Sequence, residues 1–128
     1  VIDPSQKRLD YSRAGHDRPV LLRQGEVQPL GGYGTALGIL TEPDFRLTEE
    51  SIDFKPGDRL VLYTDGLYDV VSPSGEMFDR SRLFRLLQKH AQLPAAGLCK
   101  ALFADLLAFQ EETEQFDDMS LVIVAVED

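Results

Sequence analysis

The sequence predicts an α+β fold in which helices pack on an antiparallel β-sheet. Short apolar segments separated by close turns fill the first half of the chain, two helical patterns follow, and an apolar run closes it. Segregation of strand segments from helix segments is typical of this fold class. No internal repeat or linker divides the sequence, so we expect residues 1–128 to form a single domain.

Composition and charge narrow the function classes. The chain is 43% hydrophobic with a net charge of −9, which argues against binding to nucleic acids or to anionic membranes. The negative charge does not exclude a phosphorylated substrate, because bound divalent cations would reverse the local electrostatic field. The single cysteine, Cys99, excludes an internal disulfide and lies in an apolar helical pattern, where we interpret it as core filler. A reducing compartment, most simply the cytoplasm, is therefore expected.

The first quarter of the chain predicts an antiparallel meander. A hairpin pairs residues 1–3 with residues 9–14. A loop at 15–19 leads to a strand at 20–23, which a turn at 24–26 closes.

Residues 28–44 show no clear period and are rich in glycine. Gly32 and Gly34 resemble the start of a nucleotide-binding loop, but Leu37 stands where the third glycine is needed. No strand–helix context surrounds them either. We interpret these glycines as permitting close backbone packing or a mobile loop.

The middle of the chain predicts two strands joined by a turn. Residues 45–54 alternate loosely and indicate a half-buried strand. In the turn at 55–58, Pro56 fixes φ and Gly57 supplies a positive φ. The continuous apolar run at 59–63 indicates a strand buried on both faces.

Two helices and a last strand complete the predicted elements. Asp79 is a suitable N-cap for a helix that Pro94 stops. One apolar face of this helix carries Leu83, Leu86, Leu87 and His90. A second helix is predicted from about 95 to 111, and a buried strand from 121 to 126.

Carboxylates stand at the ends of the two strands predicted to be buried. Asp65 follows the first strand, while Asp117 and Asp118 precede the second. If these strands are antiparallel neighbours about 4.8 Å apart, Asp65 and Asp117 meet at one lip of the sheet. Oxygen ligands without Cys or His nearby favour Mg²⁺, Mn²⁺ or Ca²⁺ over Zn²⁺. The alternative is that all three are ordinary turn residues, since Asp is common at strand ends.

Several short motifs stand in order along nearly the whole chain: Ala14-Gly15-His16 followed by Pro19, then Leu37-Gly38-Ile39, Pro56-Gly57-Asp58, Thr64-Asp65-Gly66-Leu67 and Asp117-Asp118-Met119-Ser120. Together these motifs resemble the PPM family of metal-dependent serine/threonine phosphatases, specifically its bacterial SpoIIE-like branch.

The resemblance implies an antiparallel β-sandwich flanked by helix layers and a binuclear Mn²⁺ or Mg²⁺ centre at one edge. It implies that Asp65 and Asp117 ligate metal, with Asp118, which stands where many relatives have Asn, supporting them. His16 belongs to a loop signature for which we expect a structural role. The implied reaction is hydrolysis of a phosphoserine or phosphothreonine ester on a regulatory protein in bacterial signalling, such as an anti-sigma-factor antagonist.

The family's first metal-binding segment, with its bridging Asp, has no match in residues 1–57. By resemblance, the chain is the C-terminal portion of the domain and is incomplete at its N-terminus. We therefore expect weak or no turnover from these residues alone, and an uncovered sheet face that favours a homodimer or a partner segment.

Two alternatives stay open. One is a non-catalytic, phosphatase-like interaction module. The other is Ca²⁺ binding by the acidic run at 111–118, which lacks the alternating ligands and central glycine of a known Ca²⁺ loop.

Overall fold

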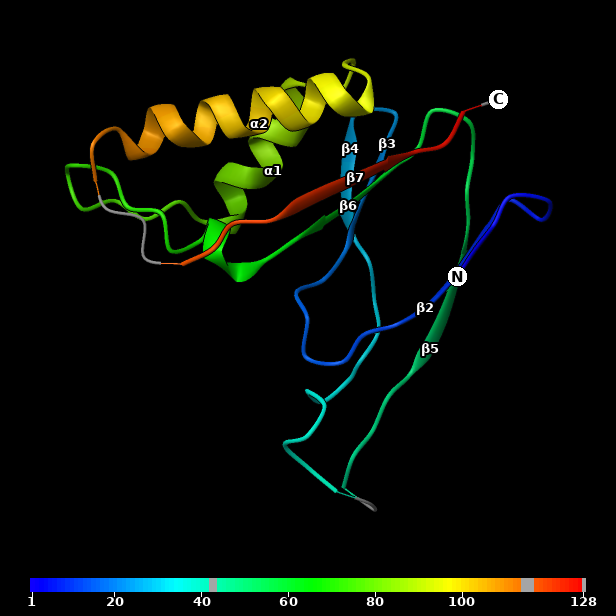
Figure 1. The fold of residues 1–128 in the computed structure, drawn as a ribbon. Coiled ribbons are helices and arrows are strands. Elements are labelled where there is room, and N and C mark those ends of the chain that lie inside the picture. Colours follow the sequence, from blue (N-terminus) through cyan, green and yellow to red (C-terminus); the bar gives the residue numbers. More distant parts are fainter. Residues whose placement is uncertain (42–43, 114–116, 128) are drawn as a thin grey trace.

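Two antiparallel β-sheets stack on each other, and both helices cover the outer face of one sheet (Figure 1). The computed structural model describes residues 1–41, 44–113 and 117–127. One sheet has the strand order β1-β2-β5 and the other has the order β4-β3-β6-β7. The strands are β1 (Ile2–Asp3), β2 (Arg8–Ser12), β3 (Val20–Arg23), β4 (Glu26–Pro29), β5 (Glu49–Asp53), β6 (Arg59–Tyr63) and β7 (Leu121–Ala125). The helices are α1 (Arg80–Lys89) and α2 (Ala95–Gln110), preceded by the short 3₁₀ helix η1 (Asp65–Leu67).

The predicted α+β class with an antiparallel β-sandwich and flanking helices is confirmed. Among the described residues, both helices lie on the β4-β3-β6-β7 sheet. The other sheet turns a polar face outward, where Arg8 pairs with Asp10 and the Ser51 hydroxyl donates to the Asp10 carboxylate. A sheet face of this kind can meet water directly.

The middle strands of the larger sheet are continuous apolar runs because both of their faces are buried. From β3 and β6, Val20 and Val61 face the helices, whereas Leu21 and Leu60 face the other sheet. The first pair contributes to a helix-side core and the second pair to an intersheet core. The fully or nearly buried members of the helix-side core are Val20, Leu22, Val61, Tyr63, Leu67, Val70, Phe78, Leu83, Leu87, Ala91, Leu98, Leu102 and Leu106. Those of the intersheet core are Leu9, Leu21, Leu30, Phe54 and Leu60.

Both helices begin at the predicted positions and α2 ends at Gln110, close to the predicted 111, whereas α1 ends at Lys89, before the predicted stop at Pro94. The Asp79 carboxylate accepts a hydrogen bond from the Arg82 backbone N–H at 2.8 Å, which confirms the predicted N-cap of α1. His90, at the end of α1, contacts an Asp105 carboxylate oxygen on α2 at 2.6 Å and so links the helices. Neither helix among the described residues has the length and apolar character needed to cross a bilayer.

Two predicted strands and one predicted arrangement differ from those observed. The expected meander is divided, because β1 pairs with β2 in one sheet and β3 with β4 in the other. The strand expected at 45–54 is shortened to β5, because Leu47 forms only an isolated bridge with Gly34. The strand expected to be buried at 121–126 is the edge strand β7, and Val122 is 53% exposed. An apolar run thus marked a strand correctly, but it did not reveal that one side of that strand lacks a neighbour in the described part of the chain.

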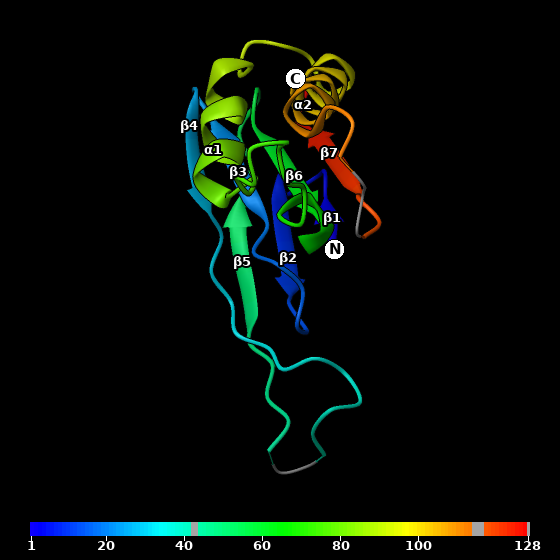
Figure 2. The ribbon, with the colours of Figure 1, turned by 90° about the vertical axis from the view of Figure 1, so that its left-hand side faces the viewer.

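The described residues between β4 and β5 extend away from the sandwich (Figure 2). Gly34 is packed so closely that a Cβ atom there would lie 1.5 Å from the Arg13 carbonyl oxygen. The expected close backbone packing is confirmed at this position. Exposed apolar side chains on the described part of this segment are Tyr33, Leu37, Ile39, Leu40 and Leu47.

A buried ion pair ties the end of β3 to the turn before β6. Asp58 is 1% exposed, and its two carboxylate oxygens accept hydrogen bonds from Arg23 Nε at 2.8 Å and Arg23 Nη2 at 2.5 Å. The Lys55 backbone N–H donates to the same carboxylate at 2.8 Å. Burial alone would raise the pKa of Asp58, but the hydrogen bonds from Arg23 and Lys55 outweigh it, so the pKa lies below its ordinary value.

We predict that Asp58→Asn lowers the free energy of unfolding by about 3 kcal/mol at neutral pH, because Arg23 loses its buried partner. A carboxyl with a lowered folded-state pKa stabilises the fold above its unfolded pKa, and this stabilisation is lost as the pH falls through the folded value. Wild type and variant should therefore converge in acid. Urea denaturation across pH measures this. Glu76→Gln, which removes the exposed partner of Arg82, is the control and should cost less than about 1 kcal/mol.

Candidate functional site

The pairing of β6 with β7 brings the predicted carboxylates to one lip of the sheet. The strands are antiparallel neighbours in which Tyr63 pairs with Leu121. The end of β6 therefore lies beside the start of β7, as the sequence predicted. Asp65 follows β6 and Asp117 precedes β7, so both stand at the same end of this strand pair.

Thr64 links the two segments by hydrogen bonds beyond the last residue pair of the β6–β7 ladder. Its backbone N–H donates to the Ser120 carbonyl oxygen at 3.1 Å. Its hydroxyl donates to the Asp118 carbonyl oxygen at 3.2 Å and accepts from the Ser120 N–H at 2.9 Å. The backbones that carry the carboxylates are thus held together by hydrogen bonds from a single residue. Sequence reasoning missed this role, although a threonine directly before Asp65 was visible.

Gly66 allows the closest approach between the two segments. A Cβ atom at this position would lie 2.3 Å from the Asp118 carbonyl oxygen and 3.5 Å from the Asp117 Cβ. Because Gly66 has no side chain, the Asp118 backbone can pack directly against it.

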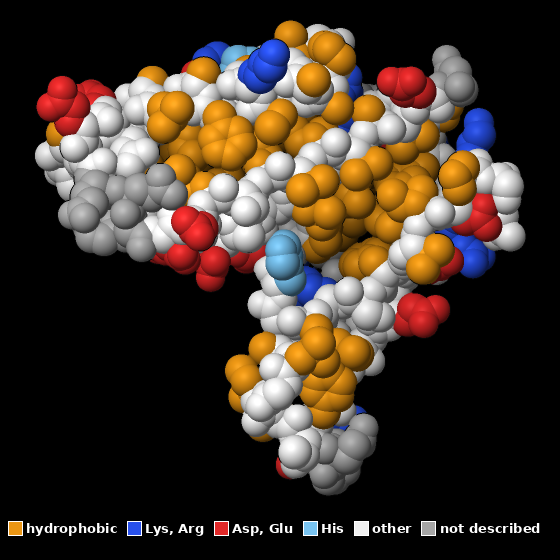
Figure 3. Space-filling view, viewed as in Figure 1, with side chains coloured by type: hydrophobic (Ala, Val, Ile, Leu, Met, Phe, Trp, Pro, Cys, Tyr) orange, Lys and Arg blue, Asp and Glu red, His pale blue; other side chains and the backbone are white. Residues whose placement is uncertain are grey.

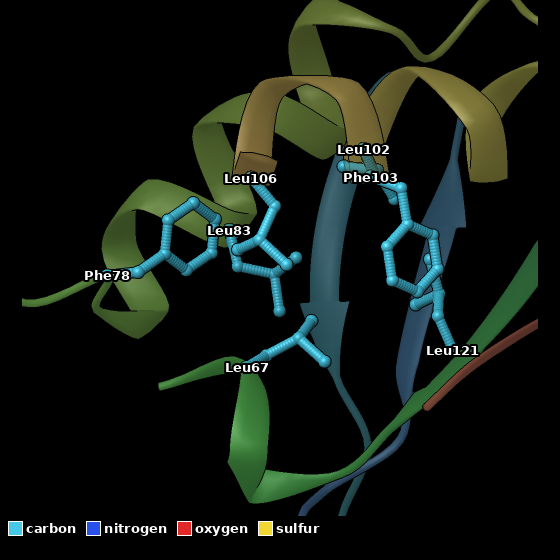
Figure 4. Close-up of a pocket in the computed structure, with 7 residues that line it drawn as sticks. All are labelled: Leu67, Phe78, Leu83, Leu102, Phe103, Leu106 and Leu121. Atoms are coloured by element: carbon cyan, nitrogen blue, oxygen red, sulfur yellow. The ribbon is translucent and has the colours of Figure 1, made fainter. Parts of the chain in front are cut away.

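The 3₁₀ helix η1 fixes the direction in which the chain leaves β6. The Tyr68 N–H donates to the Asp65 carbonyl oxygen at 2.7 Å. Leu67, 3% exposed, points into an apolar pocket between β6 and the helices (Figure 4). The residues that line this pocket are Leu67, Phe78, Leu83, Leu102, Phe103, Leu106 and Leu121. Burial of Leu67 anchors the segment that carries Asp65.

The three carboxylate residues are themselves exposed. One Asp117 carboxylate oxygen accepts the Asp118 backbone N–H at 2.7 Å, which orients that side chain. Exposed carboxylates on a hydrogen-bonded backbone suit a hard divalent cation. In the described part of the chain, however, no three or more His, Cys, Asp or Glu side chains form a group that could hold a metal ion. Asp65 and Asp117 fit as part of a ligand set, and these residues do not complete one.

A hollow opens beside Asp65. It is lined by Gly15, His16, Asp17, Thr64, Asp65, Tyr68 and Arg80. The loop that carries His16 therefore reaches the end of β6. His16 itself is exposed, and its Nδ1 lies 2.9 Å from the Asp17 carbonyl oxygen. This contact supports the loop conformation, and the structural role expected for His16 stays a prediction.

Arg80 and Tyr68 line one side of this hollow, and Tyr63 packs against Tyr68. Arg80 Nη2 lies 3.3 Å from an Asp17 carboxylate oxygen, and Arg80 Nε lies 3.4 Å from the Tyr68 hydroxyl. Tyr68 packs edge-on against Tyr63, with ring centroids 5.7 Å apart. The Tyr63 hydroxyl is buried and has no hydrogen-bond partner among the described residues, and burial raises its pKa. No motif in the sequence singled out Tyr68 or Arg80.

A family model described as Stage II sporulation protein E (SpoIIE) matches residues 1–127. The chain belongs to the SpoIIE family. The resemblance to SpoIIE-like PPM phosphatases that the sequence motifs indicated is thereby confirmed.

Two curated proteins are similar to this SpoIIE-family chain over almost its full length. Protein IcfG of Synechocystis sp. is 33% identical over 125 residues, which are 97% of this chain and 19% of that protein. Phosphoserine phosphatase RsbP of Bacillus subtilis is 30% identical over 127 residues, which are 98% of this chain and 29% of that protein. The chain thus spans less than a third of either relative.

Solved structures share the fold. The SiaA-PP2C domain of Pseudomonas aeruginosa superposes with a TM-score of 0.79 at 27% identity, covering 98% of this chain and 49% of that one. The manganese-presoaked phosphatase domain of SpoIIE from Bacillus subtilis gives a TM-score of 0.69 at 16% identity, covering 99% and 54%. At this lower identity the likeness concerns the fold alone.

We predict that Gly66→Ala in the SpoIIE-family chain destabilises the fold by about 1–3 kcal/mol, because the added methyl group displaces the Asp118 backbone. Faster hydrogen exchange at the Ser120 amide should accompany the loss. Chemical denaturation and exchange measured by NMR test both effects.

Gly97→Ala is the matched control. Gly97 lies inside α2, where an added Cβ would meet its nearest neighbours at 3.5 Å, an ordinary contact. This variant should gain up to about 1 kcal/mol from helix propensity. Equal stability of both variants would contradict the packing assigned to Gly66.

Proposed function

We propose that this SpoIIE-family chain is part of a metal-dependent phosphatase that hydrolyses phosphoserine or phosphothreonine on a regulatory protein in bacterial signalling. The observation that carries the proposal is the hydrogen-bonded junction of Thr64 with the 118–120 segment, which places Asp65 and Asp117 at one lip. The similarity to RsbP, which is named a phosphoserine phosphatase, supports the reaction class.

Asp65 and Asp117 would hold a divalent cation, Mn²⁺ or Mg²⁺, together with ligands beyond those that the described residues supply. Asp118 would support them, since its backbone N–H already orients the Asp117 carboxylate. When bound, such cations activate water as the nucleophile and offset the charge of the phosphoryl group. The chain's own part is to fix the two carboxylates through Thr64 and Gly66, and to leave the adjoining hollow open to a phosphorylated side chain.

The substrate that we propose is a phosphorylated regulatory protein, such as an anti-sigma-factor antagonist, in the cytoplasm. The net charge of −9 supports a protein over a nucleic-acid or anionic-membrane partner.

A second candidate is a phosphatase-like interaction module without turnover. The incomplete ligand set among the described residues favours it for these 128 residues taken alone. The exposed edge of β7, with Val122 on it, offers an apolar surface for a second copy or a partner segment. Figure 3 shows hydrophobic side chains gathered on the face that this strand shares with α2.

We predict that Mn²⁺ binds the 128-residue chain weakly and that Asp65→Asn or Asp117→Asn weakens it at least tenfold further, because either change removes one of two carboxylate ligands. Isothermal titration with Mn²⁺ measures the affinities. Asp53→Asn, at the exposed end of β5 in the other sheet, is the control for lost negative charge and should bind as wild type. Equal weakening in all three variants would show non-specific attraction to an acidic surface.

Turnover separates the two candidate functions. We expect the 128-residue chain with millimolar Mn²⁺ to hydrolyse a phosphoserine peptide slowly or not at all, because a carboxylate pair is an incomplete metal site. A complete SpoIIE-family phosphatase domain that contains this chain should hydrolyse it, and Asp65→Asn should abolish that activity. Full activity of the Asp65→Asn protein would remove the basis of the phosphatase proposal.

A further inference from the structure

We propose that Arg80 is a substrate-positioning residue that binds the phosphoryl group of the phosphorylated side chain in the hollow beside Asp65. The proposal rests on the proposed function and adds to it the group that receives the anion.

Charge in the hollow points to Arg80. Its described lining carries two carboxylates, from Asp17 and Asp65, and one permanently charged cation, Arg80. In a chain with a net charge of −9, an incoming phosphoryl group meets an unfavourable field. Arg80 is the lining side chain that can attract it before any metal contact forms.

Geometry leaves the guanidinium free to bind. The Arg80 side chain is 52% exposed. Its contacts with Asp17 at 3.3 Å and Tyr68 at 3.4 Å are long hydrogen bonds that use Nη2 and Nε. An arginine has five N–H donors in a planar fork, so donors remain for a phosphoryl oxygen. Nη1 makes no hydrogen bond to the described residues.

The same strand that places Asp65 also holds Arg80. Tyr63, the last residue of β6, is 2% exposed and supports the Tyr68 ring. Arg80 in turn lies with its guanidinium carbon 5.7 Å from the centre of that ring, within range of a cation–π contact. This stack couples the cation to the strand end that carries the carboxylate.

Binding without metal tests Arg80 directly. In ¹H–¹⁵N spectra of the metal-free chain, a phosphoserine peptide and inorganic phosphate should each shift the Arg80 Nε–H signal saturably, whereas the unphosphorylated peptide should not. Arg80→Gln should weaken binding of the phosphopeptide about tenfold, because a charge-assisted hydrogen bond is lost. The phosphopeptide affinity of Arg80→Lys, which keeps the charge but lacks the planar guanidinium, should lie between those of the wild type and Arg80→Gln.

Arg8→Gln is the matched control. Arg8 is also paired with an aspartate, Asp10, and is 44% exposed, but it lies on the outer face of the other sheet. Its Nε–H signal and the affinity of the variant should not change. Equal shifts at Arg8 and Arg80, or wild-type affinity in Arg80→Gln, would overturn the proposal.

Steady-state hydrolysis with Mn²⁺, by a complete SpoIIE-family phosphatase domain that contains this chain, supplies an independent readout. Arg80→Gln should raise KM for the phosphopeptide about tenfold and leave kcat within a few fold, because the contact forms with the bound substrate. An unchanged KM in an active enzyme would overturn the role of Arg80 while the phosphatase function stands. Metal-free binding that depends on Arg80, in a protein without turnover, would establish the anion site and remove the hydrolase proposal.

Discussion

The antiparallel pairing of β6 and β7 is the constraint on which the candidate site depends. Register alone brings residues at the end of one strand beside those at the start of the other, because paired strands lie within about 5 Å. Thr64 extends this pairing past the ladder with three hydrogen bonds. Gly66 then lets the Asp118 backbone approach more closely than any side chain would allow. Two carboxylates far apart in the sequence thus come to share one lip.

The remainder of the fold keeps this lip in place. β3 and β6 are buried between the helices and the second sheet, so a shift of register would expose apolar side chains to water. The Arg23–Asp58 pair holds the start of β6, and Leu67 holds the segment that follows its end. The strand is therefore anchored on both sides, and the exposed carboxylates contribute little to that anchoring.

Periodicity and turn chemistry predicted most of the elements. The runs at 20–23 and 59–63 and the Asp79 cap correspond to β3, β6 and the start of α1. Helix α1 ends at Lys89, before the predicted stop at Pro94, and Pro94 is instead the N-cap residue of α2. Local pattern does not report which strand ends a sheet, so β7 was expected to be more buried than it is. Nor did it predict the 3₁₀ turn at η1.

Local sequence pattern also predicted part of the candidate site. Asp65 and Asp117 stood out because carboxylates at the ends of apolar strands are a local signal. That they lie at one lip was predicted by assuming that the two strands are antiparallel neighbours, and the structure confirms this assumption. Arg80 and Tyr68 carry no local signal, because their arrangement depends on how α1 docks against the loop that holds Asp17. Such residues can be identified only from the tertiary contacts in the structure.

Paramagnetic broadening by Mn²⁺ tests most directly whether one cation lies between the two strand ends. At substoichiometric Mn²⁺, the amide signals of Gly66 and Asp118 should broaden together and before all others, and Asp65→Asn should spare both. Broadening that centres on the acidic residues Glu111 and Glu112, or that reaches Asp118 and leaves Gly66 sharp, would contradict a shared site.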